Sequence, residues 1–160
     1  MKILIVDDEP NIVMSLEYLM RSKGFDVRIG RNGAEALEAL EDEFFDLILL
    51  DITMPEVDGY EICRLVKNHP EWKKTHVVFV SAKSKQSDIE KGLSLGASDY
   101  IVKPFSTKTL SQRVLELLEV TENSDGVTGL HLNGNIATWD ELENNNWLPL
   151  LKEWKESQHE

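Results

Sequence analysis

The segment KILIVDD, from Lys2 to Asp8, decides the fold, because a strand-like apolar run stops abruptly at two adjacent carboxylates. The same arrangement recurs further along the chain, where apolar runs stop at Asp51, at Ser81 and at Lys103. Short runs of Val, Ile and Leu that alternate with longer helical stretches are typical of buried parallel strands. Because the ligand site of an open parallel sheet lies just past the carboxyl ends of its strands, the pattern predicts one pocket with carboxylates, a hydroxyl and an ammonium.

Five strand-and-helix units follow one another in the first 120 residues. This alternation predicts an α/β fold with a doubly wound, five-stranded parallel sheet, helices on both faces and right-handed crossovers. We expect strands at 2–6, 25–29, 46–50, 77–80 and 99–102, and helices at 10–23, 34–43, 60–68, 84–95 and 106–120.

The sequence predicts a domain at 1–120 and an acidic C-terminal extension at 121–160. Residues 121–129 are rich in Asn, Ser, Asp and Gly, which predicts a linker. Residues 130–137 alternate around an Asn-Gly pair, which predicts a small hairpin. A tryptophan-rich stretch after it has helical spacing and predicts a short helix.

Composition and charge exclude several classes of protein. The net charge is −12, with 41% hydrophobic residues and a single cysteine, Cys63, for which we expect a buried, unreactive thiol. Residues 1–120 carry 21 acidic and 15 basic side chains, and residues 121–160 carry 8 and 2, so each part has a net charge of −6. Neither part offers the basic face that nucleic acids require, and the acidic surface disfavours membranes. We find no membrane span or signal peptide and expect a cytoplasmic protein.

Asp7, Asp8 and Asp51 are candidate ligands of a divalent cation. Three carboxylates at neighbouring strand ends repel one another and raise each other's pKa, and a hard cation such as Mg²⁺ relieves that repulsion. Alone, Asp7 and Asp8 are equally well explained as turn residues. The addition of Asp51 and Lys103 at equivalent strand ends favours a functional site, and the proline after Lys103 favours an extended backbone that aims the lysine across the pocket.

These motifs resemble the receiver domain of bacterial two-component response regulators. The resemblance rests on Val6–Glu9, Asp51–Gly59, Ser81-Ala82 and Tyr100–Phe105, in matching order and spacing over about residues 1–120. The one departure is minor: Ser81 stands where threonine is at least as common in the family. The resemblance implies a flavodoxin-like fold with strand order 2-1-3-4-5.

The resemblance also implies roles for the pocket. Asp51 would be the phosphoacceptor, taking the phosphoryl group from a phosphohistidine on a sensor histidine kinase or phosphotransfer protein. Asp8, Asp51 and the backbone carbonyl of Thr53 would ligate Mg²⁺ directly, and Asp7 mostly through water. Lys103 would pair with the phosphoryl group. The chain would therefore be a signalling phosphoprotein with slow autodephosphorylation, rather than a metabolic enzyme.

Further residues have family roles in switching. Ser81 and Tyr100 would form a switch pair in which the hydroxyl moves toward the phosphate and the ring turns inward. Thr53 and Lys83 stand where the family tunes the lifetime of the acyl phosphate. The signal would then pass to the surface of the fourth helix, fifth strand and fifth helix.

The sequence allows more than one mode of downstream signalling. The extension is too short and too acidic for a DNA-binding domain, so we expect a stand-alone regulator that signals through protein–protein contacts. The alternatives are a docking or dimerisation element in the extension, with dimerisation controlled by phosphorylation, and the front part of a larger transcription factor or enzyme. A haloacid-dehalogenase-like phosphatase would also use an aspartyl phosphate, but it needs a second aspartate where this chain has Thr53. A degenerate receiver would lack Asp51 or Lys103, and both are present.

Overall fold

The computed structural model describes residues 1–122, 128–132 and 135–138. The chain divides into two compact units, Met1–Arg113 and Val114–Glu160. The first contains the whole parallel sheet and every candidate site residue.

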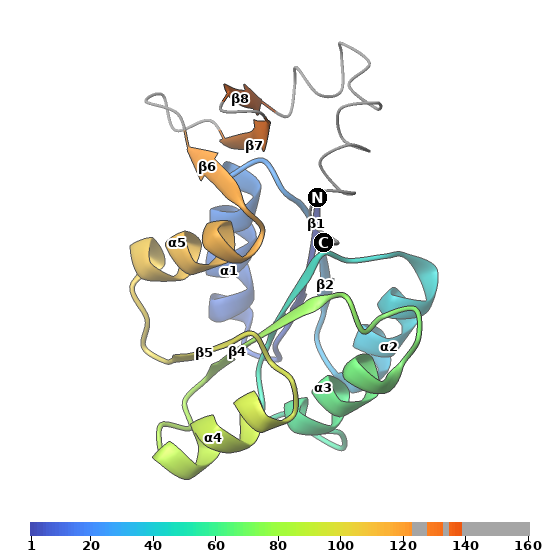
Figure 1. The fold of residues 1–160 in the computed structure, drawn as a ribbon. Coiled ribbons are helices and arrows are strands. Elements are labelled where there is room, and N and C mark those ends of the chain that lie inside the picture. Colours follow the sequence, from blue (N-terminus) through green and yellow to red (C-terminus); the bar gives the residue numbers. More distant parts are fainter. Residues whose placement is uncertain (123–127, 133–134, 139–160) are drawn as a thin grey trace. The chain divides into compact units, whose positions relative to one another are not determined.

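The first unit alternates strands and helices along the chain (Figure 1). Its single sheet has the order β2-β1-β3-β4-β5 with every neighbouring pair parallel, which confirms the predicted fold class and strand order. The strands are β1 (Lys2–Val6), β2 (Asp26–Gly30), β3 (Leu47–Leu50), β4 (His76–Ser81) and β5 (Asp99–Val102). The helices are α1 (Pro10–Ser22), α2 (Gly33–Asp42), α3 (Gly59–Asn68), α4 (Gln86–Ser94) and α5 (Thr107–Leu117), the last of which crosses into the second unit.

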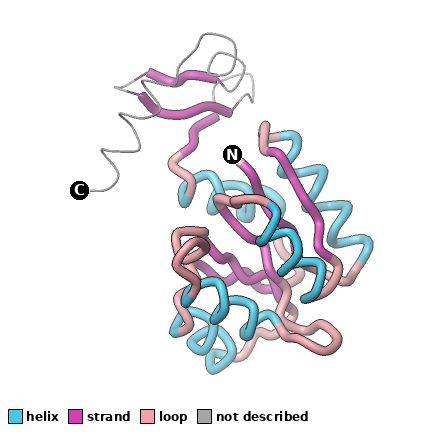
Figure 2. Tube along the Cα trace, turned by 90° about the vertical axis from the view of Figure 1, so that its right-hand side faces the viewer, coloured by secondary structure: helices cyan, strands magenta, loops and turns pink. Residues whose placement is uncertain are grey.

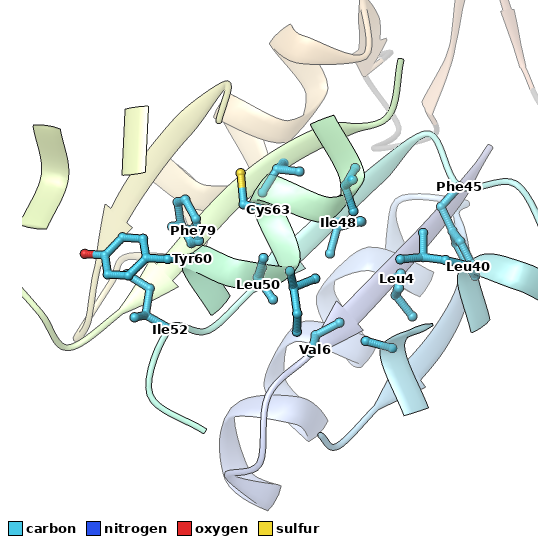
Figure 3. Packing of buried hydrophobic residues seen from close by; sticks show 14 of the residues in the cluster. Leu4, Val6, Leu40, Phe45, Ile48, Leu50, Ile52, Tyr60, Cys63 and Phe79 are labelled. Carbon is cyan, nitrogen blue, oxygen red and sulfur yellow. The ribbon is translucent and has the colours of Figure 1, made fainter. Parts of the chain in front are cut away.

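Helices cover both faces of the sheet. Helix α1 lies on one face, and α2 and α3 lie on the other (Figures 1 and 2). All four residues of β3 are buried, as a strand covered on both faces requires. The core between the sheet and α2 and α3 combines aliphatic side chains of β1 and β3 with the aromatic rings of Phe45, Tyr60 and Phe79 (Figure 3).

Strand register brings the candidate site residues to one edge of the sheet. Val6 is the register partner of Leu50, so β1 and β3 end side by side, and the amide of Asp51 donates to the carbonyl of Val6 (N–O 2.9 Å). Ser81 is paired with Val102 in the same way, and the amide of Lys103 donates to the carbonyl of Ser81 (2.8 Å).

The second unit differs from the expectation at its start. Helix α5 ends at Leu117 rather than at Val120, because Glu119 has a left-handed backbone (φ 56°) that a helix cannot contain. Strands β6 (Val120–Glu122), β7 (Thr128–Leu132) and β8 (Asn135–Thr138) then form an antiparallel sheet of order β6-β7-β8. The antiparallel pair β7–β8 lies where the sequence predicts a hairpin.

The linker predicted at 121–129 is wrong at both ends, because Thr121–Glu122 and Thr128–Gly129 lie in strands. Threonine and valine favour extended backbone, and cross-strand pairing outweighs the turn-forming residues beside them. The predicted tryptophan-rich helix falls outside the described residues.

Two further expectations concern single features. Cys63 is buried, and burial raises the pKa of its thiol to about 11, as expected of an unreactive cysteine. Among the residues that the structure describes, no helix is long and apolar enough to cross a membrane.

Candidate functional site

Three carboxylates meet at the carboxyl edge of the sheet. Asp7 and Asp8 follow β1 and Asp51 follows β3, and each contributes an oxygen to a group whose atoms all lie within 4.8 Å of one another. Asp7 and Asp51 are buried, with relative exposures of 1% and 4%, whereas Asp8 is exposed. Two carboxylates of the cluster are therefore buried and the third faces solvent, so the cluster is accessible to solvent from the side of Asp8.

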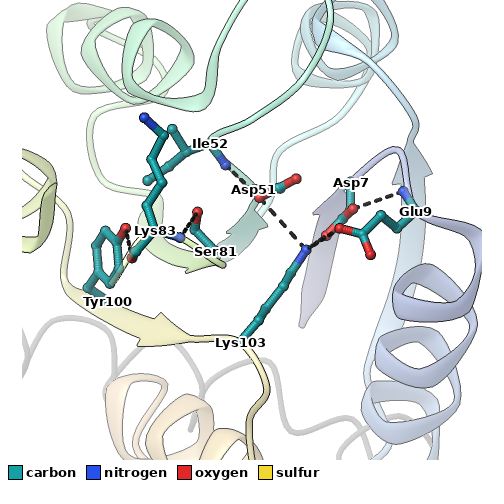
Figure 4. Close-up of polar contacts among 8 residues, drawn as sticks. All are labelled: Asp7, Glu9, Asp51, Ile52, Ser81, Lys83, Tyr100 and Lys103. Atoms are coloured by element: carbon teal, nitrogen blue, oxygen red, sulfur yellow. Dashed lines mark hydrogen bonds and ion pairs between the residues drawn. The ribbon is translucent and has the colours of Figure 1, made fainter. Parts of the chain in front are cut away.

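Lys103 brings a positive charge into this cluster (Figure 4). Its ammonium donates to Asp7 Oδ2 (2.9 Å) and Glu9 Oε1 (3.2 Å), and it lies 3.8 Å from Asp51 Oδ1. Its side chain is only 9% exposed. Burial alone lowers the pKa of Lys103, but the hydrogen bond to Asp7 and the charge of Asp51 outweigh this, so the pKa is raised. The ammonium is thus held charged beside Asp51.

The carboxyl of Asp51 is poorly stabilised as an anion. Burial, and next the charge of Asp7, raise the pKa of Asp51 to about 6, although Lys103 and the backbone amide of Ile52 (N–O 2.9 Å) oppose the change. The repulsion expected from the sequence is therefore present, but burial has the larger effect. An added positive charge at the open side would favour the ionised form.

The backbone of Lys83 links Ser81 to Tyr100. The amide of Lys83 donates to Ser81 Oγ (3.2 Å), and its carbonyl accepts from the hydroxyl of Tyr100 (2.7 Å; Figure 4). Ser81 is fully buried, and Tyr100 is 6% exposed. The ring of Tyr100 is thus turned inward, and its hydroxyl holds the loop that follows Ser81.

Of the site residues predicted from the sequence, the structure brings four together, and the side chains of two others are exposed to solvent. Asp7, Asp8, Asp51 and Lys103 converge, whereas the side chains of Thr53 and Lys83 are exposed on the loops after β3 and β4.

Two residues with a part in the geometry were not singled out from the sequence. Glu9 pairs with Lys103, and its position directly after the acidic pair was the only available signal. Gly59 starts α3 so close to the backbone that follows β3 that a Cβ there would lie 2.1 Å from the backbone oxygen of Asp51. Its place after Asp58, which caps α3, could have marked it as a point of close approach.

The donor set fits a hard divalent cation. All three side chains of the cluster offer carboxylate oxygens, which Mg²⁺ prefers, and the exposed side of Asp8 leaves room for the waters that this ion retains. No nitrogen or sulfur ligand belongs to the cluster, so its all-carboxylate donor set suits a hard cation better than zinc.

The fold and this edge of the sheet define a doubly wound α/β domain with an acidic cluster that fits a divalent cation. Residues 3–115 match the family described as the response regulator receiver domain, and the chain belongs to that family. It is 37% identical over 142 residues to the alkaline phosphatase synthesis transcriptional regulatory protein PhoP of Bacillus subtilis, covering 87% of this chain and 58% of that protein. It is 38% identical over 117 residues to the phosphate regulon transcriptional regulatory protein PhoB of Rhizobium meliloti, covering 73% and 52%.

A solved structure described as the BeF3-activated DrrB receiver domain has the same fold, with a TM-score of 0.68 and 33% identity. The match covers 74% of this chain and 97% of that one. The chain spans just over half the length of the two curated relatives it matches. The comparisons therefore show a response regulator receiver domain.

Proposed function

We propose that this receiver accepts a phosphoryl group on Asp51 from a phosphohistidine of a sensor histidine kinase or phosphotransfer protein. A carboxylate oxygen of Asp51 attacks phosphorus, the P–N bond to the imidazole breaks, and the imidazole leaves with the bonding pair. Water later attacks the aspartyl phosphate slowly, which restores the carboxylate and releases inorganic phosphate. The single observation that carries the proposal is the burial of Asp51 between a second carboxylate and a lysine.

The surroundings of Asp51 suit this reaction. The ammonium of Lys103, 3.8 Å from Asp51 Oδ1, is placed to attract the oxygens of an incoming phosphoryl group. Its hydrogen bonds to Asp7 and Glu9 fix it there, so it needs little reorganisation during transfer. The hydroxyl of Ser81, buried at the end of β4, is the candidate donor to a phosphoryl oxygen.

Mg²⁺ is the cofactor that the carboxylates fit. Asp8, Asp51 and the backbone carbonyl of Thr53 would hold it, with Asp7 acting through water. When bound, the ion supplies positive charge that offsets repulsion between the carboxylates and the phosphoryl group. Ser81 and Tyr100 then act as the switch pair, and the exposed side chains of Thr53 and Lys83 tune how readily water reaches the phosphorylated aspartate.

The phosphoacceptor is tested with acetyl phosphate and Mg²⁺, read out by intact mass spectrometry. We expect one added phosphoryl group on the wild-type chain and none on Asp51→Asn. Asp42→Asn is the matched control, because it removes an exposed aspartate at the end of α2 and should leave phosphorylation unchanged. Phosphorylation of Asp51→Asn at the wild-type level would refute the assignment.

We infer that the output of residues 1–160 is a protein–protein contact, because their net charge of −12 opposes binding to nucleic acid or anionic lipid. Homodimerisation on phosphorylation is one form of this output. A salt-resistant gel shift with one DNA sequence would contradict this. Light scattering with and without beryllofluoride tests for the dimer.

A second candidate is that the chain is the regulatory part of a longer transcriptional regulator. The match to PhoP of Bacillus subtilis favours it, because it extends over 142 residues, well beyond the 113 residues of the receiver match. The test is whether a longer protein that contains these 160 residues binds DNA in a phosphorylation-dependent way.

A further inference from the structure

Three aromatic rings form a continuous layer next to the acidic cluster but are not part of it. We call Tyr60 of α3, Phe79 of β4 and Tyr100 of β5 the aromatic layer. The rings of Tyr60 and Phe79 pack edge to face with centroids 5.5 Å apart, and those of Phe79 and Tyr100 are 5.8 Å apart. Tyr60 and Tyr100 are each 6% exposed, so the layer is almost fully enclosed (Figure 3 shows Tyr60 and Phe79).

The layer contacts α4 at three points. The hydroxyl of Tyr60 donates to the carbonyl of Asp88 (3.0 Å), and the ammonium of Lys91 lies 4.4 Å from the centroid of the Tyr60 ring. Gly92 lets the helix approach closely, since a Cβ at this position would lie 2.9 Å from Phe79 and 3.1 Å from Tyr100.

Helix α4 has little other anchorage in the core. Gly92 is its only buried residue, Ile89 is half-buried, and Leu93 is 44% exposed. A helix with so few buried apolar contacts belongs to the less stable elements of a fold. In such a helix, one hydrogen bond contributes a large share of the free energy that holds the helix against the sheet. Tyr60 provides that bond and the aromatic face for Lys91.

The same layer is tied to the switch pair. Tyr100 is at once a member of the layer and a donor to the carbonyl of Lys83, whose amide donates to Ser81. Any movement of Tyr100 out of its buried position would remove a neighbour of both Phe79 and Gly92. The position of α4 and the position of the Tyr100 ring are therefore not independent.

We propose that Tyr60 is a positioning residue that holds α4 in the arrangement in which Tyr100 is buried. Occupancy of Asp51 and the contact between Tyr60 and α4 then stabilise each other, because coupling between two sites is reciprocal. The inference rests on the proposed function, since it needs a phosphoryl group at Asp51 as the event to which α4 responds.

The test is the affinity for beryllofluoride, a phosphoryl mimic, in the presence of Mg²⁺, measured by ¹⁹F NMR on the full chain. Tyr60→Phe keeps the ring and removes only the hydroxyl. We expect its affinity to fall about threefold to tenfold, the range that one neutral hydrogen bond supports when it is made only in the competent arrangement. Hydrogen exchange of residues 86–94 should be faster in the variant, and β1 should be unchanged.

The matched control is Tyr18→Phe, which removes the hydroxyl of a tyrosine that is 80% exposed on α1. It should leave affinity and exchange at wild-type values. Gly92→Ala is a second variant: alanine favours a helix more than glycine, yet its methyl would push against Phe79, so we expect weaker binding without loss of α4 helicity.

The outcomes separate the two proposals. If the wild-type chain bound no beryllofluoride, the proposed function would fail and the role of Tyr60 with it. If the wild type bound it and Tyr60→Phe bound it equally well, with α4 exchange unchanged, the proposed function would stand and the role of Tyr60 would be refuted.

Discussion

Replacing Asp51 with asparagine should stabilise the metal-free protein at neutral pH. The pKa of Asp51 is about 6 in the folded chain against an ordinary value of 3.8, because the site is buried and faces Asp7. Between these values the unfolded chain releases a proton that the folded chain keeps, so stability falls as the pH rises. Above pH 6 the loss is complete and amounts to about 3 kcal/mol, which Asp51→Asn should recover.

The measurement is urea unfolding followed by circular dichroism at 222 nm, with a chelator present to exclude divalent cations. We expect Asp51→Asn to be more stable than the wild type by about 3 kcal/mol at pH 7 and by only about 1 kcal/mol at pH 4.5, where the folded wild type is already protonated. The slope of the free energy on urea should not change, because both proteins expose the same surface on unfolding.

The control is Glu38→Gln, which removes an exposed carboxylate on α2 and makes the net charge less negative by one, as Asp51→Asn does. Its stability should differ from the wild type by no more than about 0.5 kcal/mol at either pH. An Asp51→Asn variant of wild-type stability at pH 7, or one whose advantage did not shrink at pH 4.5, would refute the reasoning about burial and repulsion.

Three further predictions follow from single residues. Asp8→Ala should lose both Mg²⁺ dependence and phosphorylation by acetyl phosphate, measured by intact mass, and unchanged kinetics would show that Asp8 is not a ligand. Gly59→Ala should destabilise the fold by about 3 kcal/mol in urea unfolding and slow phosphorylation, because its Cβ would overlap the backbone oxygen of Asp51 at 2.1 Å. Gly96→Ala should cost about 2 kcal/mol in the same assay without slowing phosphorylation, because it needs φ +103° and its Cβ would press on Lys67 at 3.0 Å.

The sequence predicts those site residues whose position is set by the end of a strand. Asp7, Asp51 and Lys103 each follow a buried strand directly, and parallel strands in register bring such residues to one edge whatever their side-chain conformations. The five-stranded order follows from the same alternation together with the family motifs, and the structure confirms it. Periodicity and register are properties of the backbone, which is why sequence reasoning reaches them.

The rest of the site depends on side-chain directions and loop conformations that have no period. Glu9 reaches Lys103 because the turn after β1 directs it there, and the contact between Tyr60 and Asp88 joins two helices through residues that are 28 positions apart in the sequence. The end of α5 was missed for a related reason. Leu118 continues the apolar pattern of the helix, while the left-handed backbone at Glu119 that ends the helix leaves no mark in the sequence.

The geometry of Lys103 explains why the charge of the Asp51 carboxylate is only partly compensated. Its ammonium lies closer to Asp7 and Glu9 than to Asp51, so its charge is shared among three anions and Asp51 receives the weakest contact. A lysine placed directly on Asp51 would stabilise the fold but would also cover the carboxylate oxygen that we propose as the nucleophile. The protein thus keeps at Asp51 a buried anion with incomplete compensation, which costs stability when the pocket holds no cation. Binding of a divalent cation can therefore lower the free energy of this arrangement, and the cation is then in place to offset the negative charge that a phosphoryl group would add.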